Sequence, residues 1–153
     1  MLIFRYMTKY RNDDLRDLLE VTRALSDETR VRILMMLDIH ELCVCQITAA
    51  MDHAPSTISK HLSILESADL ISRRKVGRWV YYRLSHQSIS GPLRDALQLF
   101  KASVYKSKDV ADDRRKIKAL LKEDINSICK RLYHDNESSG LVEREINGAL
   151  IKA

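Results

Sequence analysis

Two cysteines separated by one residue are the groups in this sequence best suited to chemistry. Cys43 and Cys45 stand in the stretch Glu41-Leu-Cys-Val-Cys-Gln-Ile47, and the third cysteine of the chain is Cys129. Thiolates select soft ions, and a helix start lowers the pKa of a thiol. An odd and sparse set of three cysteines argues against a disulfide framework. The sequence therefore predicts reduced thiols near a helix start.

The hydrophobic pattern predicts four helices around these thiols. Their expected ranges are about Asn12 to Leu25, Glu28 to about Leu37, about Val44 to Met51, and Pro55 to about Ser67. Pro55 suits the first position of the fourth helix, although Ala54 is a poor N-cap. Because Asp52-His53-Ala54 then forms a turn, the third and fourth helices make a helix-turn-helix directly after the thiols.

A change of pattern predicts a hairpin after these helices. Two β-type runs over 70–76 and 79–84 flank Gly77-Arg78. A further helix should begin at about Pro92, and a last amphipathic helix should run from about Val110 to Tyr133. The fold class is therefore mainly α with a small β-hairpin, a winged helix-turn-helix with an extra C-terminal helix. We predict one domain over 12–105 and a helical extension over 106–153 with a mobile tail.

The charge distribution indicates a DNA-binding surface. Residues 54–105 carry eight Lys or Arg against three Asp or Glu, a net charge of +5. Polar side chains near the leading end of the fourth helix can reach base edges in the major groove, while basic hairpin residues can contact phosphates. The predicted DNA-binding residues are Ser56, Thr57, Ser59, Lys60, Ser63, Arg73, Arg74, Lys75 and Arg78. The alternative is a solvated polar face.

Two apolar stripes exceed what a small core needs, and we interpret them as a homodimer interface. A two-fold dimer places two recognition helices about 34 Å apart on one face of DNA. The stripe residues are Leu15, Leu18, Leu19, Leu93, Leu97 and Phe100. The alternative is a larger single core. The sequence has no membrane-length apolar run and no signal pattern, so we expect a cytoplasmic protein. It has no phosphate loop, nucleophile triad or C-x-x-C motif, so we predict no enzyme activity.

Four segments together resemble the ArsR/SmtB family of repressors over roughly residues 12–105. These are Ala24-Leu-Ser-Asp-Glu-Thr-Arg-Val-Arg-Ile-Leu34, Glu41-Leu-Cys-Val-Cys45, Ser56-Thr-Ile-Ser-Lys-His-Leu62 and Gly77-Arg-Trp-Val-Tyr-Tyr-Arg-Leu84. The resemblance implies a homodimer that binds double-stranded operator DNA and releases it when a toxic ion binds. In the arsenic-responsive branch the two motif cysteines bind trivalent arsenic or antimony, so arsenite or antimonite is the implied inducer.

This sequence departs from that branch at the position of its usual third cysteine, which is Thr48 here, and Gln46 replaces the usual acidic residue. Cys129 either supplies the third sulfur, from the same chain or from the partner, or is an inert packed thiol. Cysteines two residues apart lie about 200° apart on an ideal helix, so Cys43 and Cys45 would converge only if that turn unwinds. A buried cysteine is often only a small apolar residue.

Other sensors of the same fold remain open alternatives. His40 near the thiols could join a cadmium or lead site, although it is more simply a helix-end residue. Zinc or nickel sensing is disfavoured, because relatives with that site carry histidines on the dimer helices and residues 88–133 contain none. Thiols that sense oxidation by forming a disulfide, and a DNA-binding regulator without a ligand, are the remaining alternatives.

Overall fold

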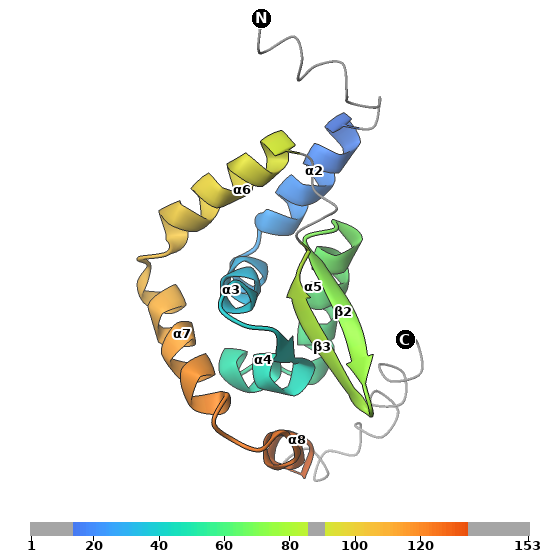
Figure 1. The fold of residues 1–153 in the computed structure, drawn as a ribbon, viewed down its shortest axis with the longest axis vertical. Coiled ribbons are helices and arrows are strands. Elements are labelled where there is room, and N and C mark those ends of the chain that lie inside the picture. The colour runs from blue at the N-terminus through green and yellow to red at the C-terminus, as the bar shows by residue number, and fades with distance from the viewer. Residues whose placement is uncertain (1–13, 86–90, 135–153) are drawn as a thin grey trace, which may run out of the picture.

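The computed structural model describes residues 14–85 and 91–134, which are mainly helical with one small sheet (Figure 1). In chain order the elements are α2 (Asp14–Leu25), α3 (Glu28–Leu37), β1 (Leu42–Cys43), α4 (Val44–Met51), α5 (Pro55–Ser67), β2 (Ile71–Val76), β3 (Trp79–Leu84), α6 (Gly91–Val104), α7 (Lys108–Leu120) and α8 (Ile125–His134). In Figure 1, α6, α7 and α8 follow one another around α3 and α4, with the sheet on the other side. Within the described residues, no helix is long and apolar enough to cross a membrane.

The corner between α2 and α3 is fixed by one aspartate and one arginine. Asp27 caps α3, because its carboxylate accepts a hydrogen bond of 3.0 Å from the backbone N–H of Arg30. The Arg30 guanidinium donates to the carbonyl oxygens of Ala24 (2.7 Å) and Arg23 (2.9 Å). Two of the last carbonyls of α2 therefore accept hydrogen bonds from a side chain in the first turn of the next helix.

The helix-turn-helix matches the predicted ranges. Asp52 ends α4 in a left-handed conformation with φ of 53°, which an aspartate tolerates better than most residues. Pro55 is at the start of α5, and Ala54 provides no side-chain cap, as the sequence indicated. The start of α5 therefore depends on packing of its inner face, where Ile58, Leu62 and Leu65 are buried.

The hairpin of β2 and β3, residues 71–84, is called the wing below. Val76 pairs with Trp79, and the two-residue loop between them begins at Gly77, whose φ of +59° is free of steric cost for glycine. The sequence did not predict β1, which pairs antiparallel with β3 and completes a sheet of order β1-β3-β2. Two residues are too short a run to show any alternation, so only the tertiary pairing reveals this strand.

The core lies between the sheet and the helices. Ile33 and Met36 of α3, Leu42 of β1, Ile47 of α4 and Leu65 of α5 are all fully buried. Ile117 and Leu120 of α7 and Ile128 of α8 belong to the same apolar cluster. The helices after residue 105 therefore share a core with the helix-turn-helix, whereas a functional division of the chain at 105/106 stays a prediction.

The prediction of a single last helix is wrong. The chain forms α7 and α8, which are separated by residues 121–124. Asp124 causes the new start, since its carboxylate accepts a hydrogen bond of 3.1 Å from the backbone N–H of Ser127. The apolar spacing continues through the break because both helices bury one face against α4, so the period alone did not reveal it.

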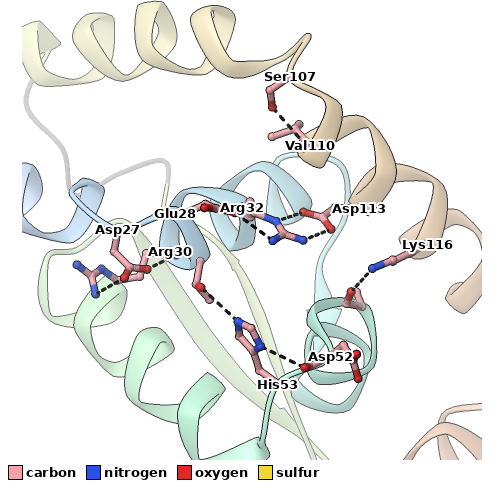
Figure 2. A network of polar contacts seen from close by, with 12 residues as sticks. Asp27, Glu28, Arg30, Arg32, Asp52, His53, Ser107, Val110, Asp113 and Lys116 are labelled. Atoms are coloured by element: carbon pink, nitrogen blue, oxygen red, sulfur yellow. Dashed lines mark hydrogen bonds and ion pairs between the residues drawn. The ribbon is translucent and has the colours of Figure 1, made fainter.

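Two polar contacts anchor α7 (Figure 2). Arg32 of α3 donates from Nε to Asp113 Oδ2 and from Nη2 to Asp113 Oδ1, each at 2.7 Å, and Asp113 is only 1% exposed. Pairing with Asp113 raises the pKa of Arg32, so the arginine stays charged. Lys116 Nζ donates to the carbonyl oxygen of Ala50 near the end of α4 at 3.1 Å. The extension is thus positioned on α3 and α4 by directional contacts as well as by apolar packing.

Candidate thiol site and nucleic-acid interface

Cys43 lies at the boundary between β1 and α4. It pairs with Tyr81 of β3 and has extended backbone angles (φ −69°, ψ 147°), whereas Cys45 lies in the first turn of α4. The helix begins between the two thiols. Cys43 and Cys45 are therefore not two residues of one helix, and the separation of about 200° expected on an ideal helix does not apply to them.

Burial decides the chemistry of Cys43. Loss of solvent raises the pKa of its thiol, and hydrogen bonds from the backbone of Cys45 and Val44 act in the opposite direction. The expectation that the helix start would lower the pKa is wrong for Cys43, because burial outweighs the backbone contacts. Its backbone N–H donates at 2.9 Å to the side-chain oxygen of Gln46, so the residue that replaces the usual acidic one closes the start of α4.

Cys45 and Cys129 are brought together by the packing of α8 on α4. The structure joins them as a disulfide, with Cα atoms 5.6 Å apart, while Cys43 is buried and unbonded. This contradicts the expectation from the small, odd number of cysteines, which carries no information about tertiary proximity. In the described residues no three His, Cys, Asp or Glu side chains are placed to hold a metal ion. A three-sulfur set including Cys43 stays a prediction.

Three tyrosines lie close enough to Cys43 to feel its charge. Burial raises the pKa of Tyr81, Tyr82 and Tyr133, and negative charge on Cys43 raises each of them further. Cys43 is therefore electrostatically close both to β3 and, through Tyr133, to α8. All three thiols border the contact between α4, β1 and α8.

The predicted base-contacting residues lie on the outer side of α5. Thr57, Lys60 and Ser63 are exposed, and Ser56 and Ser59 are half-buried. The opposite side of the helix packs into the core. This placement leaves the predicted side chains accessible at the leading half of the second helix of the helix-turn-helix.

All four predicted basic residues of the wing are exposed, namely Arg73, Arg74, Lys75 and Arg78. Three of them have partners within the chain. Arg73 Nε lies 3.2 Å from Glu66 Oε1, Arg74 binds both carboxylate oxygens of Glu41, and Arg78 Nη2 donates to Asn126 Oδ1 of α8. The Arg74 guanidinium lowers the pKa of Glu41. Sequence reasoning missed Glu41 and Asn126 as wing partners, because neither contact has a sequence spacing that indicates it.

Helix α2 has one buried apolar face and one exposed apolar face. Val21 and Ala24 are buried in the core, whereas Leu15, Leu18 and Leu19 are 67%, 47% and 48% exposed. These three leucines are called the α2 apolar face below. On α6, Leu97 packs against the core, Phe100 lines an open groove of about 410 Å³ between α2–α3 and α6–α7, and the Leu93 side chain lies outside the described residues. Leu99 is 72% exposed, and the sequence analysis did not include it.

Two of the histidines, His40 and His53, belong to no group of three possible metal ligands among the described residues. His40 is exposed, and its Nδ1 lies 3.0 Å from the carbonyl oxygen of Glu41. His53 lies in the turn between α4 and α5, within 3.4 Å of the Thr29 hydroxyl (Figure 2). These placements agree with the reading of His40 and His53 as helix-end and turn residues.

Comparison with known proteins decides the family. The protein-family model described as "Bacterial regulatory protein, arsR family" matches residues 27–73. The arsenical resistance operon repressor of Escherichia coli strain K12 is 43% identical over 68 residues, which are 44% of this chain and 58% of that protein. The arsenical resistance operon repressor of Bacillus subtilis strain 168 is 33% identical over 92 residues, which are 60% of this chain and 88% of that protein.

The chain belongs to the ArsR family. The solved structure of Mb0332 from Mycobacterium bovis, described as a homodimeric winged helix-turn-helix DNA-binding domain, superposes with a TM-score of 0.51 at 24% identity, covering 65% of this chain and 95% of that one. This likeness confirms the predicted winged helix fold. The family is one of regulatory proteins, and this agrees with the prediction that the chain is not an enzyme. The chain spans 58% to 63% of the length of the first curated relatives that it matches.

One departure from the arsenic-responsive pattern of the ArsR family now has a structural counterpart. Thr48, at the position of the usual third cysteine, is buried, and its hydroxyl donates to the carbonyl oxygen of Val44 at 2.8 Å. It is therefore occupied within α4. Cys129 of α8 is the thiol that reaches this helix instead, next to Cys45.

Proposed function

We propose that this protein is a transcriptional repressor that binds operator DNA as a homodimer and releases it when trivalent arsenic or antimony binds Cys43, Cys45 and Cys129. The observation that carries the proposal is the contact of Cys129 with Cys45 at the start of α4. This helix directly precedes α5, which carries the predicted base-contacting residues. Arsenical repressors among the relatives support the choice of ion.

The chemistry of the donors fits a trivalent metalloid. Sulfur is the soft ligand that such ions prefer, and Cys45 and Cys129 already lie at bonding distance. Arsenite, As(OH)₃, condenses with three thiols to give three arsenic–sulfur bonds and three waters, so each thiol proton leaves in a water molecule.

The disulfide must be opened before the ion can bind. Two molecules of a reducing thiol, or one dithiol, supply two electrons and two protons to Cys45 and Cys129 and are themselves converted to a disulfide. Cys43 must then move toward the pair, and it is held between β3 and the start of α4. Its movement would shift α4 and hence α5. A coupling free energy of about 1–3 kcal/mol between ion and DNA would change operator affinity roughly 5–150-fold.

The α2 apolar face supports the homodimer. Leu15, Leu18 and Leu19 are exposed, although each is a large apolar side chain. A two-fold axis would bury each of these leucines twice, at about 1.5–3 kcal/mol for each fully buried side chain. For the dimer to bind two half-sites, its two α5 helices have to lie about 34 Å apart, the spacing of successive major grooves.

A redox sensor of the same fold is the second candidate, and the Cys45–Cys129 disulfide favours it. Hydrogen peroxide would oxidise the two thiols to the disulfide and be reduced to two waters. In this alternative the change of state is the bond itself, and Cys43 takes no part.

The test is fluorescence anisotropy of a DNA duplex enriched from a random pool by the reduced protein. Arsenite, antimonite, cadmium, zinc and hydrogen peroxide are titrated in separate experiments. The proteins are the wild type, Cys43→Ser, Cys129→Ser and the matched control Lys130→Ala, an exposed neighbour on α8. We expect arsenite and antimonite to release DNA from the wild type and from Lys130→Ala, and release to weaken strongly in both cysteine variants.

Each other outcome contradicts part of the proposal. Unchanged release from Cys129→Ser would remove Cys129 from the site. Release by peroxide without release by arsenite would select the redox sensor. If no reagent releases DNA, the protein is a DNA-binding regulator without a thiol signal, and if no duplex is enriched, the DNA-binding proposal itself is wrong.

A further inference from the structure

Two arginines of the wing are held by residues that flank the thiols. Arg74 binds both oxygens of the Glu41 carboxylate, with Nη2 2.7 Å from Oε2, and Glu41 precedes Cys43 by two residues. Arg78 donates to Asn126, which precedes Cys129 by three residues on α8. Both arginines are exposed and would otherwise be available to phosphates.

The first contact is linked to Cys43 through a row of residues across the sheet. Cys43 of β1 pairs with Tyr81 of β3, and Tyr81 pairs with Arg74 of β2. The guanidinium of Arg74 lies 5.8 Å from the centroid of the Tyr81 ring. Directly opposed residues in neighbouring strands lie side by side on one face. A displacement of Cys43 is therefore transmitted to Arg74 both along β1, through Glu41, and across β3, through Tyr81.

The second contact is linked to Cys129 through α8. Residues three apart on a helix lie on the same side, so Asn126 and Cys129 share a face of α8 while Cys129 contacts Cys45. Asn126 Nδ2 lies 3.4 Å from Asp124 Oδ1, which orients the amide. Arg78 is further positioned over the ring of Trp79, 4.8 Å from its centroid. The docked position of α8 thus determines whether the Arg78–Asn126 hydrogen bond can form.

We propose that Glu41 and Asn126 are positioning residues that withdraw Arg74 and Arg78 from DNA when Cys129 is bound to the α4 thiols. In the structure, α8 is joined to α4 and both arginines are held. When the thiols are reduced and unliganded, α8 can separate from α4, Asn126 moves away, and phosphates compete successfully for the guanidinium groups. The inference rests on the proposed function. It adds a second way in which ion binding weakens DNA binding, through the arginines of the wing, besides any movement of α5.

The experiment measures the ratio of the DNA dissociation constants with and without saturating arsenite, for full-length protein. The variants are Glu41→Gln, Asn126→Ala and the double variant. Asp69→Asn is the matched control, because Asp69 is exposed and asparagine tolerates its φ of 56°. Removing a negative charge changes DNA affinity in general, but it changes both dissociation constants alike, so the ratio isolates the proposed contacts. Arsenic–sulfur absorbance in the ultraviolet reports ion binding separately, and circular dichroism reports folding.

We expect the double variant to bind arsenite as the wild type does and to lower the ratio about fivefold or more, within the usual range for coupling between sites. Asp69→Asn should leave the ratio unchanged. Asn126→Asp should increase it, since a carboxylate holds Arg78 more strongly than an amide does. Unchanged ratios in the double variant and in Asn126→Asp would overturn the inference. A wild type that fails to bind arsenite or DNA would instead overturn the proposed function.

The disulfide offers an independent readout. If docking of α8 withdraws the wing, the oxidised protein should bind DNA more weakly than the reduced protein without any ion. The double variant should reduce this difference as well. Equal affinity of the oxidised and reduced wild type would contradict the role of α8 docking.

Discussion

Asp113→Asn tests whether the extension is anchored by a buried ion pair. Asp113 is 1% exposed and accepts two hydrogen bonds of 2.7 Å from Arg32, whose side chain is 19% exposed. Breaking a buried pair by removing one charge costs about 3–5 kcal/mol. Arg32 keeps some solvent and a second partner, Glu28, at 3.3 Å, so we expect the lower end, about 3 kcal/mol.

The assay is urea unfolding at one fixed protein concentration, because dimerisation makes stability depend on concentration. Asp112→Asn is the matched control: Asp112 pairs with Arg115 at the surface of the same helix, and such pairs contribute about 0–1 kcal/mol. The double variant Arg32→Met/Asp113→Leu should recover much of the loss, since it leaves no buried charge unpaired. If Asp113→Asn is as stable as Asp112→Asn, the ion pair does not anchor α7.

Three further predictions concern the interface, the wing and Cys43. Leu18→Asp should raise the dimer dissociation constant, measured by analytical ultracentrifugation, at least about tenfold, because a two-fold interface loses the same leucine twice. Ile39→Asp is the control and should leave this constant unchanged. If Leu18→Asp also leaves it unchanged, the dimer interface does not include the α2 apolar face. Lys75→Ala should lower the steepness of the plot of log DNA affinity against log salt concentration by about 0.9. Lys122→Ala is the control and should leave the slope unchanged. An unchanged slope in Lys75→Ala would show that Lys75 does not contact a phosphate. In the oxidised protein, burial raises the pKa of Cys43, so the unfolded state ionises first and the melting temperature should fall as pH rises above about 8.5. Cys43→Ala should abolish this fall in melting temperature up to about pH 10, where tyrosines begin to ionise. An equal fall in the variant would show that Cys43 is not the group responsible.

Local signals predicted the helix-turn-helix and the wing well. Pro55 marks the start of α5, and Gly77 marks the turn of the wing. Both residues act through their own backbone angles, which do not depend on distant parts of the chain. This is why the order of elements could be inferred from sequence, whereas the family was indicated by the resemblance of four sequence segments.

The features that the sequence analysis missed depend on tertiary contacts. The β1 strand exists because Leu42 and Cys43 meet β3, and the Cys45–Cys129 contact exists because α8 folds back onto α4. The break that allows this return is an N-cap at Asp124, whose signal was overlooked because the apolar period continues through it. Val21 and Ala24 of α2, which the sequence analysis did not single out, face the core, whereas the predicted interface residues Leu15, Leu18 and Leu19 are exposed.

X-ray absorption spectroscopy of arsenite bound to the reduced protein tests most directly whether three thiols from two elements bind one ion. The account predicts three sulfur neighbours for each arsenic in the wild type, and two sulfurs with one oxygen in Cys43→Ser and in Cys129→Ser. A wild-type spectrum with two sulfurs that is unchanged in Cys129→Ser would contradict it, because the α8 thiol would then have no part in sensing.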